Sequence, residues 1–243
     1  MLSFYQFYPR QIITPDPNSA YFIRDFEATY LNSGDIHNPE WYIQQKIKEN
    51  ADGYFDFSKS MIDIGACYGT YSFTLPFKHS YMFEPNKEYC AYCHANMLLQ
   101  GRIYDADIFN MAVSNESGTI RFDGYNGGER ASEYNAWTNT PCVDVPCVRL
   151  DDMQDRLTNI GFIKIDIEGM EPYALMGAKQ VIRNNNYPPI MFESWPEGRM
   201  ETPEQYNKRI SLLNEVFNEL GYTVIWNWCG EYGDDENHLA IRK

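Results

Sequence analysis

The chain has 243 residues, enough for one large domain, and its composition argues against several classes of protein. Asp and Glu number 34 against 20 Lys and Arg, so the formal net charge is −14. This balance argues against a nucleic-acid binder, which needs clustered Lys and Arg, and against docking on an anionic membrane surface. Hydrophobic residues make up 44% and aromatic residues 16%, so we expect a folded protein with a sizeable core.

The first residues of the chain predict neither export nor membrane insertion. Met1–Arg10 lacks the basic start and the apolar run of a signal peptide. No segment approaches the roughly 18 consecutive apolar residues that cross a membrane. The six cysteines are scattered, unlike those of a small disulfide scaffold. We therefore expect a soluble, cytoplasmic protein without a membrane partner, and the sequence leaves its oligomeric state open.

The N-terminal quarter differs from the rest of the chain. Residues 1–39 are rich in Pro and aromatic residues and show little periodicity. Pro39 predicts the start of a helix that ends near Gly53. We expect residues 1–59 to form an arm and a helix that pack on a domain comprising residues 60–243.

From Ser60 onward, short apolar strands alternate with helical segments, which is typical of a parallel α/β sheet. The predicted strands comprise residues 60–64, 81–84, 108–113, 162–166, 190–193, 222–226 and 238–241. The predicted helices comprise residues 69–76, 86–100, 171–184 and 202–220. The last two strands have no helix between them, which predicts an antiparallel hairpin at one edge of the sheet.

Residues 119–149 interrupt this alternation. Thr119–Phe122 and Cys142–Leu150 are predicted as two strands joined by a loop rich in Gly and Asn. The sequence thus predicts a β-hairpin inserted before the fourth strand of a seven-stranded, mostly parallel, Rossmann-like sheet.

The first strand of this sheet leads into a loop that indicates a cofactor. Gly65 and Gly69 have a G-x-x-x-G spacing, and Asp63 precedes them. Glycines let the backbone turn sharply and let a ligand approach. A carboxylate here would repel a pyrophosphate but suits S-adenosylmethionine, which carries an ammonium and a sulfonium and no phosphate. An ordinary tight turn between strand and helix is the alternative.

Further positions support a cofactor site. Glu84 ends the second strand, 19 residues after Gly65, where a carboxylate can accept hydrogen bonds from both ribose hydroxyls. The alternative for Glu84 is a charge at a helix N-terminus. Ala112 and Val113 follow the third strand and are expected to line a groove for adenine, although core residues would have the same composition.

Several motifs occur in an order that resembles a known family. They are Ile62-Asp63-Ile64-Gly65-Ala66, Gly69-Thr70-Tyr71-Ser72, Phe83-Glu84-Pro85, Ala112-Val113-Ser114 and Arg149-Leu150-Asp151-Asp152. The most specific motif is the K-x-D-x-E-G-x-E run that begins at Lys164. Together they resemble the FkbM family of S-adenosylmethionine-dependent methyltransferases over residues 60–195. The resemblance implies a class I methyltransferase fold and, usually, O-methylation of a sugar or polyketide-type hydroxyl.

The cofactor-binding residues expected from the loop and from this resemblance form one set. They are Asp63, Gly65, Ala66, Tyr68, Gly69, Tyr71, Ser72, Glu84, Pro85, Ala112, Val113 and Asp166.

Candidate catalytic residues follow the later strands, at the edge where open α/β sheets bind ligands. A hydroxyl that accepts a methyl group must lose its proton, so a base or a metal should be nearby. Asp166 is the first candidate for the base or a metal ligand, and Glu193 is the second. Asp166 could instead only accept backbone N–H bonds at a turn. Lys164, on the same face as Asp166, could pair with it or orient the acceptor. The sequence is compatible with a divalent cation but does not imply one.

Three further polar residues have less certain roles. His238 begins the last strand and is a candidate catalytic residue, although a single histidine is usually structural. A catalytic role for Glu168 stays open, because the motif that carries the family resemblance includes this residue. Glu171 is expected to stabilise the start of a helix.

Aromatic and polar residues outside the expected core are candidates for recognising the acceptor. Tyr125, Arg130 and Trp137 lie in the inserted loop, and Trp195 follows Glu193. Loops on a rigid sheet often determine specificity. The alternative is that this loop is only a poorly ordered hairpin tip. Ring faces with interspersed carboxylates suit a neutral, polyhydroxylated acceptor, either a small molecule or a glycan.

The sequence therefore predicts an S-adenosylmethionine-dependent O-methyltransferase that acts on a hydroxyl of a sugar or glycan. One alternative is an oxidoreductase with a nucleotide cofactor on a similar sheet, which the G-x-x-x-G loop beside Asp63 disfavours. Another is a non-catalytic binding module of the same fold, which the intact acidic set disfavours; its members are Asp63, Glu84, Asp166 and Glu193.

Overall fold

A computed structural model of the protein describes residues 10–13, 20–23, 39–123, 130–131, 142–198, 201–230 and 236–242. The main strands are β3 (Ser60–Ile64), β4 (His79–Phe83), β5 (Ala106–Phe109), β10 (Ile160–Ile165), β11 (Ile190–Glu193), β12 (Thr223–Ile225) and β13 (Asn237–Ile241). The helices are α2 (Pro39–Glu49), α3 (Thr70–Thr74), α4 (Lys87–Leu99), α5 (Glu171–Met176), α6 (Lys179–Asn184) and α7 (Pro203–Leu220), with short 3-10 helices η1 (Ile103–Asp105) and η3 (Leu150–Met153). The remaining strands are β1 (Arg10–Ile13), β2 (Ala20–Ile23), β6 (Ala112–Val113), β7 (Gly118–Asp123), β8 (Arg130–Ala131) and β9 (Val143–Val148).

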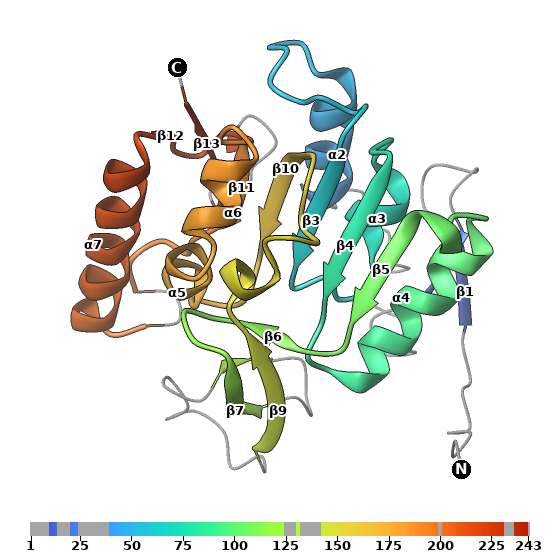
Figure 1. Ribbon diagram of the computed structural model, residues 1–243, viewed down its shortest axis with the longest axis horizontal. Coiled ribbons are helices and arrows are strands. Elements are labelled where there is room, and N and C mark those ends of the chain that lie inside the picture. Colours follow the sequence, from blue (N-terminus) through green and yellow to red (C-terminus); the bar gives the residue numbers. More distant parts are fainter. Residues whose placement is uncertain are drawn as a thin grey trace.

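The centre of the molecule is a seven-stranded sheet in the order β12-β13-β11-β10-β3-β4-β5. The strands from β11 to β5 run parallel, and β13 is antiparallel to both β11 and β12. Figure 1 shows this sheet between α7 at one side and α4 at the other. The predicted parallel sheet with an antiparallel C-terminal hairpin is confirmed, and each predicted strand lies within a few residues of an observed one.

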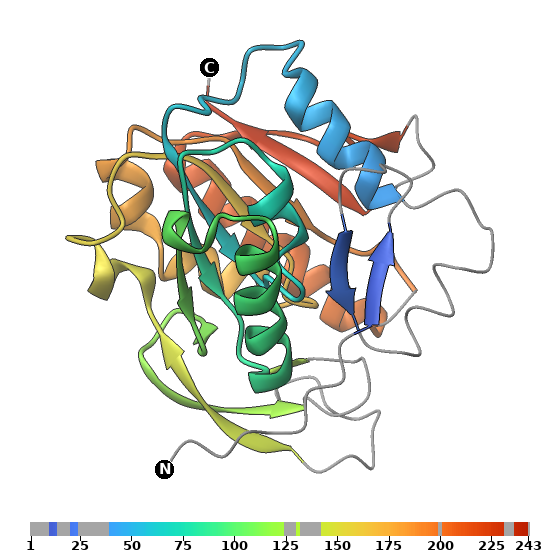
Figure 2. The same cartoon turned by 90° about the vertical axis from the view of Figure 1, so that its right-hand side faces the viewer.

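Apolar side chains cover both faces of the central strands, which explains their nearly continuous hydrophobic sequences. Ile64 and Ile165 pack in one cluster with Phe192 and with residues of α5, α6 and α7. Met61 and Phe162, which alternate with them, pack on the opposite face with residues of α2 and α3. Figure 2 shows α5 and α6 on one side of the sheet and α2 on the other.

The start of α7 follows the predicted capping signal. The Thr202 hydroxyl accepts a hydrogen bond from the Gln205 backbone N–H (3.3 Å), and the Gln205 side chain accepts one from the Thr202 N–H (2.9 Å). This reciprocal pair satisfies N–H groups that have no partner within the helix.

The predicted strand 108–113 is wrong as a single element. β5 ends at Phe109, and Ala112 and Val113 form β6, which belongs to a second sheet. The chain leaves the central sheet at Asn110, whose side-chain amide donates to the backbone carbonyls of Glu84 and Pro85, both at 2.9 Å. A contact between distant segments therefore divides an apolar run that looks continuous in the sequence.

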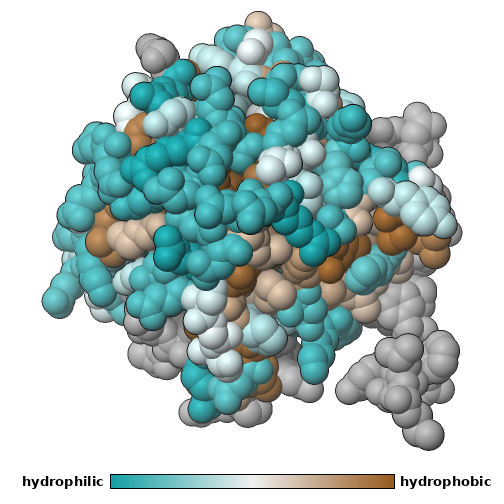
Figure 3. Space-filling view, viewed as in Figure 1, coloured by the Kyte–Doolittle hydropathy of each residue, from teal (hydrophilic) through white to brown (hydrophobic). Residues whose placement is uncertain are grey.

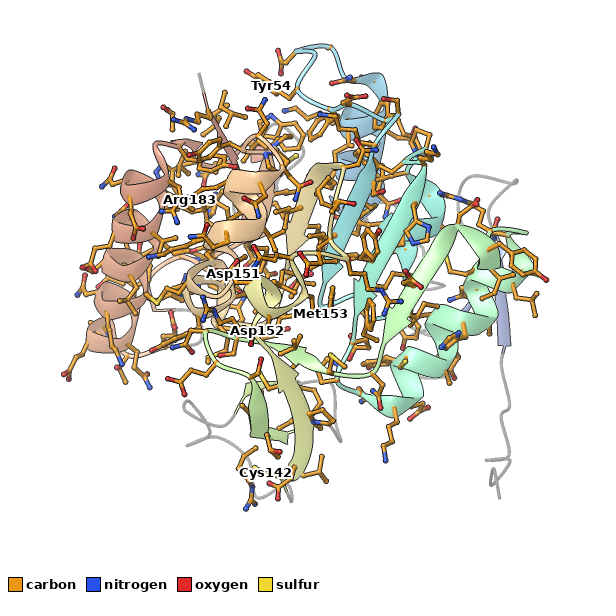
Figure 4. The ribbon with its side chains drawn as sticks, viewed as in Figure 1. Tyr54, Cys142, Asp151, Asp152, Met153 and Arg183 are labelled. Carbon is orange, nitrogen blue, oxygen red and sulfur yellow. The ribbon has the colours of Figure 1, made fainter. Side chains whose placement is uncertain are left out.

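The predicted helix 171–184 is also divided, into α5 and α6. Gly177 packs so tightly that a Cβ atom would lie 2.1 Å from the backbone oxygen of Ser114. The Asp151 carboxylate then accepts the N–H groups of Gln180 (2.8 Å) and Val181 (3.0 Å) and so caps the start of α6. Figure 4 labels Asp151 where η3 meets α6.

The predicted inserted hairpin is present as β7 and β9, which pair antiparallel from Gly118 opposite Cys147 to Phe122 opposite Val143. It is larger than a hairpin, because β6 and β8 extend it to a four-stranded sheet in the order β6-β9-β7-β8. Figure 1 shows this second sheet below the carboxyl ends of β3, β4 and β10.

The surface matches the acidic, polar composition. Figure 3 shows a mostly hydrophilic face with hydrophobic residues grouped towards the side of α4 and β5. None of the helices in the described part of the chain has the length and apolar character needed to cross a bilayer.

Gly65 provides a test of how closely β3 and β10 approach each other. It has φ +75°, and a Cβ atom there would lie 1.8 Å from the backbone oxygen of Asp166. We predict that Gly65→Ala lowers the free energy of unfolding by roughly 2–4 kcal/mol, from left-handed strain plus overpacking. Gly53→Ala is the matched control, because Gly53 has φ +69° with no atom within 4 Å of the added carbon. Denaturant unfolding measures both, and equal losses would contradict the close approach.

Candidate functional site

The ends of β3, β4, β10 and β11 meet at the sheet edge that faces the second sheet. A cavity of about 430 Å³ lies there. Its wall contains Gly65 after β3, Pro85 after β4, and Ala112 and Val113 of β6. These four residues belong to the predicted cofactor set, so the structure brings the loop after β3 and the predicted adenine groove to one cavity.

The rest of the cavity wall includes residues that sequence reasoning missed. Ile167, Met170 and Tyr173 reach it from the segment after β10, and a run from Ser114 to Phe122 reaches it from the second sheet. Ile167 and Met170 lie within four residues of the end of the predicted strand 162–166. Their position after a strand end was the signal that could have identified them as cavity residues. The contribution of β7 had no such signal, because it depends on how the second sheet packs against the first.

The glycine loop itself is closed by protein contacts. The N–H groups of Gly65 and Ala66 both donate to the Phe83 carbonyl, at 3.0 and 3.1 Å. Gly65 is required because the Asp166 backbone, rather than a ligand, occupies the place of its Cβ atom. Gly69 has φ +77° and precedes α3, whose short helix carries Tyr71 and Ser72.

Tyr68, in the same loop, packs against α4. Its ring contacts the rings of Tyr89 and Tyr92, with centroids 4.9 and 5.3 Å away. Ala66 and Tyr68 therefore belong to a packed cluster against α4.

Glu84 follows β4 and contacts both the glycine loop and the start of α4. Its side chain is buried, and its two oxygens accept the backbone N–H groups of Cys67 and Asn86, both at 2.8 Å. Burial raises its pKa to about 7, against the lowering effect of these two hydrogen bonds. The carboxylate thus ties the glycine loop to the start of α4, while its neighbours Phe83 and Pro85 line the cavity. Binding of ribose by Glu84 stays a prediction.

Asp63, Lys164 and Asp166 form a charged group on the other face of the central strands. The Lys164 ammonium lies 3.7 Å from Asp63 Oδ1 and 3.3 Å from Asp166 Oδ2, and it donates to the Gly65 carbonyl at 2.7 Å. Asp63 also accepts the Ser72 hydroxyl at 2.7 Å. Burial raises the pKa of Asp63, and Lys164 and Ser72 partly offset this increase.

Glu193 lies beside Asp166 because β10 and β11 are paired in register. Ile165 is opposite Phe192, so the next residue of each parallel strand is Asp166 or Glu193. Glu193 is half-buried, and the Asp166 carboxylate is close enough to interact with it electrostatically. Burial and the neighbouring carboxylates of Asp166, Glu168 and Glu171 raise the pKa of Glu193 well above its usual range. The structure therefore brings together the two predicted candidates for the base.

Glu171 stabilises the turn that leads from β10 into α5. Its Oε1 accepts the N–H groups of Ile167 (3.1 Å) and Gly169 (3.0 Å), in a turn where Glu168 has φ +61° and Gly169 has φ +98°. Oε2 is buried with no hydrogen-bond partner among the described residues. Burial raises the pKa of Glu171 to about 7.

His238 and Trp195 are both buried near the end of β11. The His238 ring accepts the Asn227 N–H through Nδ1 (2.9 Å), and its Nε2 lies 3.1 Å from the Ser194 carbonyl, to which it donates. Both nitrogens are thus engaged by the backbone. Trp195 packs against the Arg209 guanidinium, which pairs with Glu201 at 2.6 Å. Neither side chain faces the cavity described above.

Some predicted residues cannot be placed. Tyr125 and Trp137 lie outside the described residues, and only the backbone of Arg130 is described, in β8. Within the described ranges, no group of three or more His, Cys, Asp or Glu side chains has the arrangement of a metal site. The possible metal-ligand roles of Asp166 and Glu193 therefore gain no support from the geometry.

Comparisons with known proteins give a consistent result. A family model described as "Methyltransferase FkbM domain" matches residues 63–224. The crystal structure of methyltransferase FkbM from Methylobacillus flagellatus KT is 17% identical, with a TM-score of 0.53 over 90% of this chain and 56% of that one. The present chain thus spans little more than half the length of that protein.

A putative caffeoyl-CoA O-methyltransferase from Staphylococcus aureus has 13% identity and a TM-score of 0.49, over 89% of this chain and 88% of that one. A search among curated proteins finds no match. At 17% identity the likeness to the Methylobacillus flagellatus structure shows the fold alone, which is the predicted Rossmann-like, class I methyltransferase fold. The family match covers well over half of the sequence. The chain therefore belongs to the FkbM methyltransferase family.

Proposed function

We propose that this methyltransferase transfers the methyl group of S-adenosylmethionine to a hydroxyl oxygen, and that its acceptor is a sugar or glycan. Membership of the family implies S-adenosylmethionine as the cofactor. The observation that carries the O-methyl proposal is the pairing of Asp166 with Glu193 at the carboxyl ends of β10 and β11. This pair offers a proton acceptor beside the cofactor loop.

The residues at this edge fit S-adenosylmethionine. The cavity of about 430 Å³ is within the range of roughly 300–1,000 Å³ typical of small-molecule sites. Phe83 and Val113 give it an apolar wall that suits adenine. The partly exposed carboxylate of Asp166, on the other side of the glycine loop, suits the positive charges of the methionine end. S-adenosylmethionine, when bound, supplies an activated methyl group on a sulfonium.

Side chains of the protein would then bind the acceptor and accept its proton. A hydroxyl held in line with the methyl group needs a base within hydrogen-bonding reach. The Asp166 side chain is 31% exposed, so it can contact an acceptor, while Lys164 holds its other side. Glu193, whose pKa is raised, can share a proton with Asp166.

The charge around this pair supports a neutral acceptor. Asp166 and Glu168 would repel a phosphorylated or carboxylated group close to the reacting oxygen. A sugar hydroxyl carries no charge and can donate to a carboxylate. Tyr125, Arg130 and Trp137 of the inserted loop belong to this proposal as acceptor contacts, and a small-molecule or glycan acceptor is the partner we propose.

Calorimetry and a labelled-methyl assay test this function. S-adenosylhomocysteine should bind and NAD should not, which separates a methyltransferase from an oxidoreductase. The protein should then label members of a panel of sugars, nucleotide sugars and glycans, with amines included as rival acceptors. Parallel assays with Mg²⁺ and with EDTA decide whether a cation contributes. Cofactor binding without transfer to any acceptor would favour a binding module, and labelling of amines alone would overturn O-methylation.

Asp166→Asn tests the base directly. We predict that turnover falls by roughly 10²–10⁴-fold, the usual contribution of general base catalysis. Affinity for S-adenosylhomocysteine should fall much less than turnover, because the asparagine retains the size and polarity of the side chain but loses the charge beside the methionine end. Asp155→Asn, at an exposed carboxylate outside the site, is the control. A kcat equal to that of the unmodified protein would remove Asp166 from the proton transfer.

Glu171→Gln tests how buried carboxylates link stability to pH. The pKa of Glu171 is about 7 in the folded protein and 4.5 in a free side chain, so the folded state keeps its proton over this interval. Its contribution to stability is therefore full below pH 4.5 and is lost as the pH rises through 7. We predict that Glu171→Gln reduces the fall in unfolding free energy between pH 5 and 7 by up to about 1.4 kcal/mol per pH unit.

The glutamine should fit this site, because one oxygen can still accept both backbone N–H groups. The exposed Glu197→Gln is the matched control. Denaturant unfolding across this pH range measures both variants. An unchanged slope for Glu171→Gln would show that Glu171 does not titrate as described.

A further inference from the structure

The Lys164 side chain is buried at the junction of three structural elements. It is 4% exposed, on β10, and its ammonium reaches the Gly65 carbonyl of the glycine loop, Asp63 of β3 and Asp166 after β10. Its ammonium also lies 5.3 Å from the centre of the Tyr71 ring on α3. A lysine ammonium has three N–H donors, and here three oxygen acceptors surround it.

These contacts join two segments of the chain. The proposed reaction requires that these two segments lie at a fixed distance from each other. One segment is the loop at Gly65, which forms part of the cavity wall. The other begins at Asp166, whose backbone N–H donates to the Ile64 carbonyl at 3.0 Å. The backbone therefore fixes the start of each segment. Lys164 is the side chain that reaches from the loop carbonyl to the Asp166 carboxylate.

We propose that Lys164 is a positioning residue, which holds the Asp166 carboxylate at a set distance from the cofactor loop and does not itself contact the acceptor. This inference deepens the proposed function and rests on it. Burial, and the one carbonyl and two carboxylates around the ammonium, separate it from a lysine that orients the acceptor, because such a lysine must present its ammonium to the ligand. Lys164 also supplies the positive charge that offsets the nearby carboxylates of Asp63 and Asp166.

The single variant Lys164→Met would leave Asp63 as an uncompensated buried carboxylate, which can prevent folding. The double variant Asp63→Asn/Lys164→Met avoids this problem, since removing both partners of a buried ion pair is often close to neutral. The asparagine can still accept the Ser72 hydroxyl. This variant therefore breaks the contact to Asp166 while sparing the fold.

Hydrogen exchange measured by mass spectrometry tests the proposal without any acceptor. In the double variant, amides of residues 63–69 and 164–170 should exchange faster together, roughly tenfold or more, as expected when a hydrogen bond to a charged group is lost. Lys179→Met, which removes an ion pair with Glu219 on α7, should change neither segment. A folded double variant with unchanged exchange in both segments would overturn the proposal.

A second measurement uses the unmodified protein and decides the matter if the double variant does not fold. Acetylation with acetic anhydride should modify Lys164 more slowly than Lys179, whose side chain is 25% exposed. Equal rates would show that the ammonium is free to contact ligands, and would overturn the proposal.

Steady-state kinetics in the double variant provide a third readout once an acceptor is known. A positioning role lowers kcat, by up to about 100-fold for a misplaced group, with little change in the acceptor KM. A raised KM with unchanged kcat would instead assign Lys164 to acceptor binding. Failure of the unmodified protein to methylate any acceptor would count against the proposed function alone, because the exchange and acetylation results stand without turnover.

Discussion

The close approach of the ends of β3 and β10 is the constraint on which the site depends. The Asp166 N–H donates to the Ile64 carbonyl, and the Asp166 carbonyl lies where a Cβ atom of Gly65 would be. This packing leaves no room for any residue but glycine at position 65. It also sets where the glycine loop begins and where the Asp166 side chain leaves the backbone. The contacts of Lys164, Glu84 and Glu171 then hold the loops in the positions that this approach defines.

The site has two parts because neighbouring residues on a strand point to opposite faces of the sheet. Ile64 and Phe83 point to the face of α5 and α6, where they form an apolar wall of the cavity. Asp63 and Lys164 point to the face of α3, where the charged group lies. The loop at Gly65 passes between the two. A cofactor with an apolar, flat end and a charged end can therefore contact both parts only by crossing the sheet edge at this loop.

The buried and half-buried carboxylates form two groups with different roles. Glu84 and Glu171 each accept two backbone N–H groups, and both have raised pKa values near 7 because they are buried. They stabilise turns. Asp166 and Glu193 lie side by side with part of their surface exposed, so they remain accessible to a ligand. Acidic residues in one family motif, such as Asp166 and Glu171, therefore contribute to the site in different ways.

The sequence predicted those features that depend on local patterns. The apolar runs identified the central strands, and the spacing of Gly65 and Gly69 identified the loop. The predicted strand ends placed Asp166 and Glu193 at the same edge of the sheet, and the observed register of β10 and β11 places them side by side. Features set by contacts between distant segments were not predictable in this way. The packing of Gly177 against Ser114 divides a helix, and Asn110 ends β5 by bonding to the segment after β4. The hydrogen bonds of Glu84 and the cavity wall from β7 depend on such contacts too.

The cavity and the charged group at the carboxyl edge of β3 and β10 should act as one cofactor site. A crystal structure of the protein with S-adenosylhomocysteine would show whether they do. We expect the adenine against Pro85 and Val113, and the amino-acid end across the Gly65 loop beside Asp166. A ligand bound elsewhere, with this cavity unfilled at saturating concentration, would contradict it.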